Sequence, residues 1–419
     1  MQTRLTDLIK DTPEGEEADA ILRSCVHCGF CLATCPTYQL LGNELDSPRG
    51  RIYLIKQLLE GQEVTEKTQL HLDRCLTCRA CETTCPSGVR YGHLLDIGRG
   101  MVEQQIPRTT YATFKRYALR KLLPNRALSS FFMGAARLGR PFLPAHLKRS
   151  IQLKPSTNRT PSGKVHTRAM LILDGCVQPA LTPNTNHATT RVLDRLGIAV
   201  ITAEQAGCCG ALAYHLNAQE EGLNAMRRNI DAWWPFVTRH ENPAEAIIVT
   251  ASGCGVTVKD YGHLLQHDPV YAEKAARISS LTRDISEIIA AETAALVPLL
   301  QAADISATSS SPRNLAFHAP CTLQHGMKLR GKIEPILQAA GFNLVQVADP
   351  HLCCGSAGTY SILQPELSRQ LRDNKITALT KENPELVVTA NIGCQMHLQG
   401  CTSLPVRHWI ELLDETLTG

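Results

Sequence analysis

Two short cysteine runs decide the fold of this chain: CVHCGFCLATCP at residues 25–36 and CLTCRACETTCP at residues 75–86. Both runs have the spacing C-x2-C-x2-C-x3-C-P. In such a run, three closely spaced thiolates bind three irons of one [4Fe–4S] cube, and the fourth cysteine reaches a neighbouring cluster. The proline that follows turns the chain and carries no N–H group that needs a partner. The two runs therefore predict two [4Fe–4S] clusters near the N-terminus.

In bacterial two-cluster ferredoxins, the fourth cysteine of each run binds the cluster of the other run, and we assign the ligands in the same way. The first cluster takes Cys25, Cys28, Cys31 and Cys85. The second cluster takes Cys75, Cys78, Cys81 and Cys35. Two structural zinc sites are the alternative, although zinc usually pairs two CxxC units across a longer loop. The 39 residues between the runs predict a helical setting, with one helix that starts near Ser47-Pro48 and stops at Gly61.

The composition is that of a globular protein of two or three domains, with 419 residues, 43% hydrophobic and 20% charged. No apolar run approaches the ~20 residues that span a bilayer. The acidic N-terminal stretch lacks the apolar segment of a secretory signal. We therefore expect a cytoplasmic protein, where disulfides are rare. In that compartment, 17 cysteines point to metal ligation.

A basic segment follows the cysteine runs. The 70 residues between Glu103 and Asp174 contain 14 Lys and Arg and no acidic residue. Aromatic residues alternate with the cations at 108–150, which predicts one or two basic amphipathic helices. Three roles compete: packing as a connector on the protein or on an acidic partner protein, binding to an anionic membrane surface, and, with the least support, binding to nucleic acid. Residues 151–168 are rich in Ser, Thr, Pro and Gly and predict a linker.

The C-terminal half, residues 169–419, is an internal repeat. In each copy a cysteine follows a short apolar run, a Cys-Cys-Gly triplet comes 32 residues later, and a last cysteine follows a third apolar run. The first copy contains Cys176, Cys208, Cys209 and Cys254, and the second contains Cys321, Cys353, Cys354 and Cys394. The offset between the copies is 145 residues, and a polar stretch at 302–313 joins them.

The apolar runs LIL, IAVI and IIV, then LAF, LVQV and LVV, predict buried parallel strands with helices between them, for example MKLRGKIEPILQAAG. Each copy is then a β-α-β unit with its cysteines at the carboxyl ends of the strands, where α/β sheets bind ligands. Gly210 and Gly355 would let the backbone approach a bulky group closely.

Four cysteines in each copy suit a [4Fe–4S] cluster, zinc or a redox disulfide, and inert buried cysteines are the remaining alternative. Four histidines lie near these cysteines: His215, His318, His325 and His397. Of these, His397, in Cys394-x-x-His, is the best additional ligand, and Cys401 has no counterpart in the first copy. Neither a GxGxxG after a strand nor a GxxxxGK[ST] is present, so no nicotinamide, flavin or nucleotide site is indicated.

Together these features resemble the iron–sulfur subunits of flavin-dependent 2-hydroxy-acid dehydrogenases, in particular the glycolate oxidase (glycolate dehydrogenase) family. The similarity is carried by CVHCGFCLATCPTYQLLGNELDSPRGRIYLIKQLLEG and CLTCRACETTCPSGVRYGHLLDIGR and by the two Cys-Cys-Gly (CCG) repeats. Related CCG proteins occur in anaerobic glycerol-3-phosphate dehydrogenase, in heterodisulfide reductase and among the lactate-utilisation proteins. Where that motif is full it ends in CxxC, whereas here Thr257 and His397 replace the last cysteine.

The resemblance implies an iron–sulfur member of an enzyme complex, which carries electrons from partner FAD subunits, where glycolate is oxidised to glyoxylate, to a quinone or similar membrane acceptor. It implies a peripheral position on the cytoplasmic face of the inner membrane and no bound nucleic acid. The alternatives are the same role in lactate or glycerol-3-phosphate oxidation, a thiol–disulfide reductase of the heterodisulfide type, and a zinc-stabilised interaction protein.

The expected architecture is α+β to α/β, with a helical two-cluster ferredoxin-like domain followed by two β-α-β cysteine-rich repeats. Its predicted parts are 1–105, the two-cluster domain; 106–168, the basic connector; 169–300, the first CCG repeat; and 313–419, the second CCG repeat.

Overall fold

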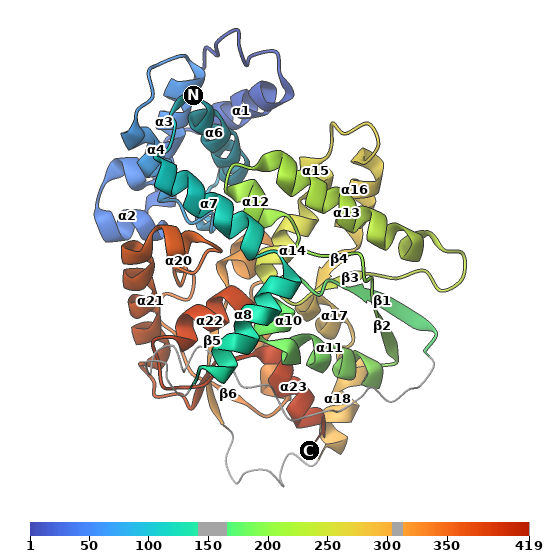
Figure 1. The fold of residues 1–419 in the computed structure, drawn as a ribbon. Coiled ribbons are helices and arrows are strands. Elements are labelled where there is room, and N and C mark those ends of the chain that lie inside the picture. Colours follow the sequence, from blue (N-terminus) through green and yellow to red (C-terminus); the bar gives the residue numbers. More distant parts are fainter. Residues whose placement is uncertain (141–165, 304–312, 419) are drawn as a thin grey trace.

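The computed structural model describes residues 1–140, 166–303 and 313–418. Residues 151–165 of the predicted linker at 151–168 lie outside the described residues. The same holds for residues 304–312 of the predicted bridge at 302–313. In Figure 1 the N-terminal helices form one end of the molecule, and two α/β units make up the rest.

The first part of the chain is entirely helical within the described residues. Its helices are α1 (Pro13–Ser24), α2 (Pro36–Leu41), α3 (Pro48–Leu59), α4 (Glu66–Asp73), α5 (Ala80–Thr84) and α6 (Tyr91–Gln105), with 3-10 turns at Phe30–Leu32 and Glu44–Asp46. The predicted helix after the first run is confirmed as α3. It begins there because the Ser47 side chain accepts a hydrogen bond from the Gly50 N–H and Pro48 occupies the first turn.

Up to residue 140, where its described part ends, the basic segment forms two helices: α7 (Thr110–Leu122) and α8 (Arg126–Leu138). Figure 1 shows them crossing one face of the molecule, from the N-terminal helices toward the α/β units. Contacts between α8 and α10 (Gln178–Leu181) attach the second of them to the first repeat.

The first repeat is a four-stranded parallel sheet in the order β2-β1-β3-β4. The strands are β1 (Arg168–Ile172), β2 (Ile198–Thr202), β3 (Ile247–Val249) and β4 (Thr282–Asp284). The helices after α10 are α11 (Pro183–Arg195), α12 (Ala211–His215), α13 (Gln219–Thr238), α14 (Ser252–Lys259), α15 (Tyr261–Leu264), α16 (Ala272–Leu281), α17 (Ile285–Ala291) and α18 (Thr293–Ala302).

The second repeat has the same topology, with the parallel order β6-β5-β7-β8. Its strands are β5 (Asn314–His318), β6 (Asn343–Leu344), β7 (Leu386–Thr389) and β8 (Val406–His408). A π-helical turn at Thr322–Gly326 precedes α19 (Glu334–Ala339), α20 (Tyr360–Leu363), α21 (Pro365–Thr380), α22 (Ile392–Gln399) and α23 (Trp409–Thr418). The repeat and its parallel strands are therefore confirmed.

Three details differ from the sequence prediction. The fourth strand of each sheet was not predicted, because the three residues of β4 and of β8 contain no apolar run. The strand expected at LVQV pairs only through Asn343 and Leu344. The helix expected from MKLRG onward begins only at Glu334, because Lys328 and Gly331 adopt left-handed φ values of 59° and 76°, which a right-handed helix does not allow.

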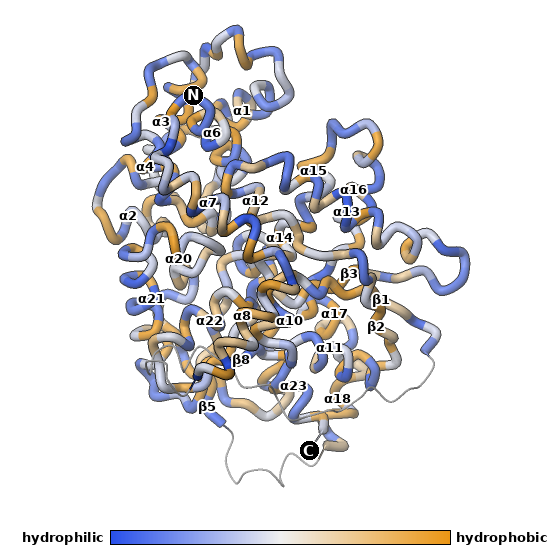
Figure 2. Tube along the Cα trace, in the orientation of Figure 1, coloured by the Kyte–Doolittle hydropathy of each residue, from blue (hydrophilic) through white to orange (hydrophobic). Residues whose placement is uncertain are grey.

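The two repeats share one hydrophobic core. It combines β1, β3 and α11 of the first copy with β5, β7 and α23 of the second, and Figure 2 shows hydrophobic stretches of the chain gathered around these strands. Within the described residues, no single helix is long and apolar enough to cross a bilayer. The pair α17–α18 passes that test only as a unit bent by 80°, and Ile289 and Leu296 of this pair lie in the shared core.

Candidate metal centres

The first cavity combines cysteines from both runs. Cys25, Cys28 and Cys31 line it together with Cys81 and Cys85. Cys28 is exposed, whereas Cys25 is buried, so this cavity reaches the surface. The structure thus places the four ligands predicted for the first cluster around one cavity.

The second cavity contains the other predicted set, Cys35, Cys75, Cys78 and Cys81. Cys35, Cys78 and Cys81 are buried, in contrast to the exposed cysteine of the first cavity. Burial raises the pKa values of Cys78 and Cys81 well above the ordinary range, because a thiolate is poorly solvated there. A bound cationic iron centre would replace those protons, which fits a cluster at this position.

The two loops that carry these cysteines have the same backbone. His27 and Thr77 occupy equivalent positions with φ of 54° and 52°, and Gly29 and Arg79 follow with φ of 85° and 58°. Such left-handed residues are uncommon outside glycine and concentrate at functional sites. They curl each loop around its cavity, and the Thr77 N–H donates to Cys75 Sγ at 3.5 Å.

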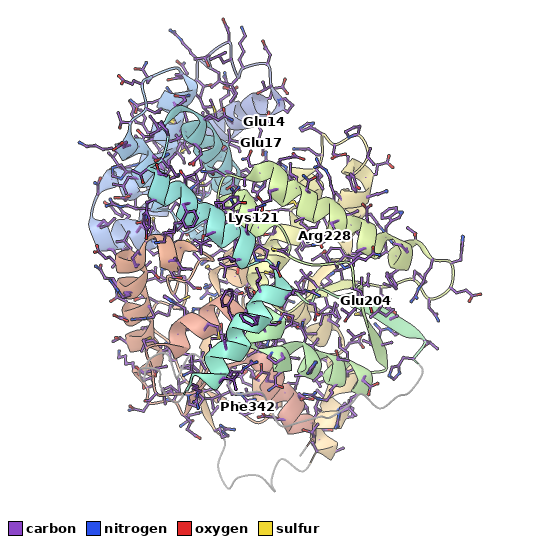
Figure 3. All side chains as sticks on the ribbon, in the orientation of Figure 1. Glu14, Glu17, Lys121, Glu204, Arg228 and Phe342 are labelled. Carbon is purple, nitrogen blue, oxygen red and sulfur yellow. The ribbon has the colours of Figure 1, made fainter. Side chains whose placement is uncertain are left out.

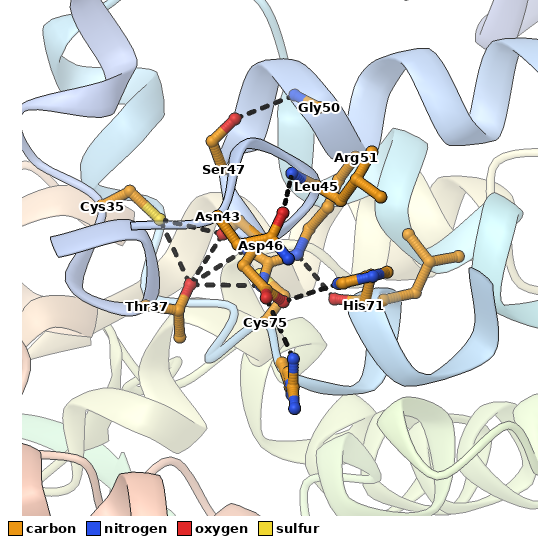
Figure 4. Close-up of polar contacts among 12 residues, drawn as sticks. Cys35, Thr37, Asn43, Leu45, Asp46, Ser47, Gly50, Arg51, His71 and Cys75 are labelled. Atoms are coloured by element: carbon orange, nitrogen blue, oxygen red, sulfur yellow. Dashed lines mark hydrogen bonds and ion pairs between the residues drawn. The ribbon is translucent and has the colours of Figure 1, made fainter. Parts of the chain in front are cut away.

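A buried polar network supports the second cavity (Figure 4). Thr37 Oγ1 lies 3.3 Å from Cys35 Sγ and donates to the Asp46 carbonyl at 3.0 Å. The Arg51 guanidinium donates to Thr37 Oγ1 at 3.1 Å and pairs with the Asp46 carboxylate at 3.3 Å. His71 and Arg74 contact the same carboxylate at 3.1 and 3.0 Å.

This network places a permanent positive charge beside the second cavity. Arg51 is 1% exposed and Asp46 is 0% exposed. Burial lowers the pKa of Arg51, but the negative charges of Cys75 and other neighbours outweigh this and raise it. Sequence patterns carried no signal for the network, because its contacts join residues from 2 to 28 positions apart without a regular spacing.

In the first repeat the four cysteines line one end of the sheet. Cys176 follows β1, Cys208 and Cys209 follow β2, and Cys254 lies in the first turn of α14, not at the strand end itself. A hydrogen bond with Cys208 raises the pKa of Cys176, and burial adds to it. The same bond lowers the pKa of Cys208.

The second repeat arranges its cysteines in the same way and adjoins the second ferredoxin cavity. Cys321 Sγ lies 3.7 Å from Cys353 Sγ, and Cys394 lies in the first turn of α22. Leu76 and Cys78 pack in one apolar cluster with Cys353. This contact joins segments far apart along the chain, so the sequence could not indicate it.

The glycines after the cysteine pairs serve helix packing. Gly210 and Gly355 have φ of 88° and 86°, and a Cβ at either would lie 2.6 Å from a helix carbonyl, that of Gly222 or Ser368. The expected close approach is therefore present, but its partner is the backbone of α13 or α21, not a metal group.

The histidines differ from the prediction. His397, the preferred extra ligand, hydrogen-bonds Ser368 Oγ through Nε2 at 3.2 Å. His325 contacts Thr83 and the His351 carbonyl. His318 instead lies with Cys354 and Cys394, their ligand atoms all within 4.8 Å of one another. Burial lowers the pKa of His318 to about 3, so its ring is neutral.

His215 Nδ1 lies 3.2 Å from Asp96 Oδ1 of α6. This contact joins α12 to the N-terminal helices.

A third cluster, Glu17, His93 and His263, joins α1, α6 and α15 (Figure 3 labels Glu17). Its imidazole rings stack with centroids 4.0 Å apart and planes 7° apart. A metal ion bound by an imidazole lies in the ring plane, so one ion cannot serve two stacked parallel rings. Both rings instead lie 3.2 Å from Glu17 Oε1. Burial raises the pKa of Glu17, but these hydrogen bonds hold it well below its ordinary value.

The basic segment docks on the rest of the chain through its cations. Arg116 pairs with Asp73 at 3.0 Å, and Lys121 (labelled in Figure 3) pairs with Glu221 of α13 at 3.1 Å. Arg126 donates to the Gly175 carbonyl at 2.9 Å. The large apolar side chains of α7 and α8 point outward: Tyr111, Phe114, Tyr117, Phe131, Phe132 and Leu138 are 51–84% exposed.

Comparison with known proteins agrees with this architecture. The cysteine-rich (CCG) domain family matches residues 170–259 and 315–399, and the 4Fe-4S dicluster domain family matches residues 21–89. The glycolate oxidase iron-sulfur subunit of Escherichia coli (strain K12) is 54% identical over 100% of this chain and 99% of its own length.

Two further relatives are more distant. The probable glycolate oxidase iron-sulfur subunit of Bacillus subtilis (strain 168) is 30% identical over 90% of this chain and 88% of its own length. Lactate utilization protein A of an Exiguobacterium species is 28% identical over 57% of this chain and 94% of its own length.

Proposed function

The chain belongs to the family of glycolate oxidase iron–sulfur subunits, and from this membership we propose that it carries electrons in a complex that oxidises glycolate to glyoxylate. Its 4Fe-4S dicluster domain supplies the iron–sulfur centres, and other subunits complete the redox complex. Because glycolate oxidation releases two electrons and two protons, we propose that FAD-binding partners take the hydride and pass the electrons on singly. A quinone or similar membrane acceptor would receive them.

We propose two [4Fe–4S] clusters with the crossed ligand sets. The observation that carries this proposal is the lining of the two cavities: Cys85 of the second run lines the first cavity, and Cys35 of the first run lines the second. Bound there, the clusters would supply one-electron redox chemistry. The residues themselves supply thiolates, exclude water from the second site through burial, and place the Arg51 charge beside it.

The crossed assignment is tested by cysteine-to-serine variants of the anaerobically purified complex. Cys85→Ser should perturb the same EPR signal as Cys28→Ser, and Cys35→Ser should perturb the other signal. Cys401→Ser, whose sulfur only hydrogen-bonds the Leu398 carbonyl, is the control and should change neither. If Cys85→Ser perturbed the signal of the second run instead, the crossing would be wrong. A single cluster in the unaltered complex would refute the two-cluster proposal.

The exposed cluster is the better position for receiving electrons. Cys28 is exposed, and Val26 and Phe30 beside it are 68% and 61% exposed. In the second set Cys35, Cys78 and Cys81 are buried, and Cys78 packs against Cys353 of the second repeat. We propose that the FAD-binding partner docks over Cys28 and that electrons then move inward. Phe30→Asp should weaken association with the partner without lowering the iron content of the isolated chain.

We propose a cytoplasmic location on the inner face of the membrane, with α7 and α8 as the contact. Neutralising Arg116 or Lys121 would break internal ion pairs, so the exposed aromatics give the cleaner test. Phe114→Ser with Phe131→Ser should reduce sedimentation of the complex with anionic phospholipid vesicles. Val270→Ser, at a 64% exposed position in the first repeat, is the control. Undiminished sedimentation of the double variant would contradict this contact.

We propose that the CCG cysteines hold one or two further metal centres. We also propose a division of the chain into the parts 1–105, 106–168, 169–300 and 313–419. Lactate is the alternative substrate, because relatives named lactate utilization protein A share part of the sequence. The purified complex would be mixed with glycolate, lactate or glycerol 3-phosphate, and the compound that reduces the clusters would be identified as the substrate.

A further inference from the structure

A buried phenol group lies in the wall shared by the two ferredoxin cavities. Tyr91 begins α6 and is 4% exposed. Its side chain lines the first cavity and also the second, and it packs in the core of the N-terminal helices. Among the described residues, the Tyr91 hydroxyl oxygen has no hydrogen-bond partner although it is buried. Because buried polar atoms are nearly always paired, this hydroxyl requires an explanation.

The groups around this hydroxyl limit what it can bond to. A phenol keeps its proton at neutral pH, so it needs an acceptor. Burial raises the pKa of the Tyr91 phenol well above its ordinary range, and the neighbouring Cys75 thiol adds most to that rise, whereas Arg51 opposes it. A guanidinium has only donors and cannot accept the phenol hydrogen, but a sulfur can, and a thiolate accepts more strongly than a thiol. Among these neighbours, Cys75 Sγ is therefore the preferred acceptor.

Both ends of this contact are held in place by other hydrogen bonds. On the acceptor side, the Thr77 N–H donates to Cys75 Sγ at 3.5 Å, and Arg99 donates to the Cys75 carbonyl at 2.8 Å. On the donor side, the Gly92 N–H donates to Glu82 Oε1 at 2.6 Å, which ties the start of α6 to α5. Contacts of this kind fix the orientation of a metal ligand and of the groups that bond to it.

We propose that the Tyr91 hydroxyl donates a hydrogen bond to Cys75 Sγ when the second cluster is bound, and that this bond raises the reduction potential of that cluster. Hydrogen bonds to cluster sulfurs are among the features that set the potential. Such a bond stabilises the reduced form more, because that form carries more negative charge. Tyr91 is then a positioning residue that favours electron transfer inward, from the exposed cluster to the buried one. This inference rests on the proposed two-cluster function.

The test is an anaerobic redox titration of the complex, followed by EPR. Tyr91→Phe removes only the hydroxyl. It should lower the midpoint potential of the signal that Cys35→Ser perturbs, and it should leave the iron content and the signal that Cys28→Ser perturbs unchanged.

Tyr360→Phe is the matched control. Tyr360 is 6% exposed and lines a cavity together with Cys75, but its hydroxyl already donates to the Arg74 carbonyl at 3.2 Å. Removing that hydroxyl should therefore leave both midpoint potentials at those of the parent.

A second measurement detects the hydrogen bond directly. After exchange into D2O, electron–nuclear double resonance should show an exchangeable proton coupled to the second cluster that is missing in Tyr91→Phe. Unchanged potentials in Tyr91→Phe would overturn the proposal, as would a shift of the first cluster instead, an equal shift in Tyr360→Phe, loss of iron, or an unaltered set of proton couplings. A single cluster signal in the unaltered complex would instead refute the two-cluster function, so the two failures are distinguishable.

Discussion

The carboxylate of Asp46 is predicted to be the most sensitive charged group in the N-terminal domain. Asp46→Asn keeps the shape of the side chain and removes its charge, leaving Arg51 buried at 1% exposure without its carboxylate partner. Breaking a buried ion pair from one side destabilises by about 3–5 kcal/mol. Against a typical folding free energy of about 5–15 kcal/mol, this is a large fraction.

The assay is urea unfolding of the cluster-loaded chain under argon, followed by the visible absorbance of the clusters and by circular dichroism. With an m-value of about 1–3 kcal/mol per M, the midpoint should fall by at least about 1 M. Asp19→Asn is the control, because the Asp19–Arg23 pair at 2.5 Å lies at the surface, with 28% and 58% of the side chains exposed. Exposed pairs contribute about 0–1 kcal/mol.

A double variant separates charge burial from other effects. Asp46→Asn with Arg51→Met removes both charges, so it should recover part of the lost stability. Recovery should be incomplete, since His71 and Arg74 also contact the carboxylate. The reasoning fails if Asp46→Asn matches the surface control, or if the double variant is no more stable than the single one.

Three further outcomes are expected. Gly355→Ala should lower the melting temperature more than Gly331→Ala, because both have positive φ but only the Gly355 Cβ would meet backbone, at 2.6 Å; equal losses would contradict this. Burial lowers the pKa of His408 to about 4, so the neutral ring stabilises the fold above about pH 6.5, and this contribution should be lost as the pH falls toward 4. The melting temperature of His408→Gln should therefore fall less between pH 7 and 4.5 than that of the parent protein. Equal falls in melting temperature would argue against this. Asp414→Asn should weaken the contact between the repeats by breaking its 2.6 Å pair with Arg191, which limited proteolysis would reveal as faster cleavage; an unchanged cleavage rate would refute this.

Much of the architecture could be predicted from local patterns. The spacing of the two runs predicted which cysteines share a cavity, and the 145-residue offset predicted two sheets of one topology. Both signals are local or periodic, so they are readable without knowing the fold. The crossed ligand sets and the CCG metal sites remain predictions.

The parts that were missed depend on contacts between distant segments. The strand β8 is recognisable only because Val387 pairs with Val406 in the folded sheet. The sequence favoured His397 through its CxxH spacing, but which histidine faces the cysteines depends on how β5 meets α22. For the basic segment, the sequence left packing on the protein and contact with a membrane both open. The partner of Arg116 is Asp73, 43 residues away, and no local pattern indicates that pair.

The shared core of the two repeats affects how the chain folds during synthesis. Trp409, Ile410 and Leu413 of α23 pack in the same core as Val192 and Leu193 of α11. The first repeat therefore cannot bury its apolar face until the last helix has left the ribosome, and until then that face is open to chaperones and to aggregation. Removing α23 would leave both repeats incomplete, so the C-terminus is a poor place for truncation.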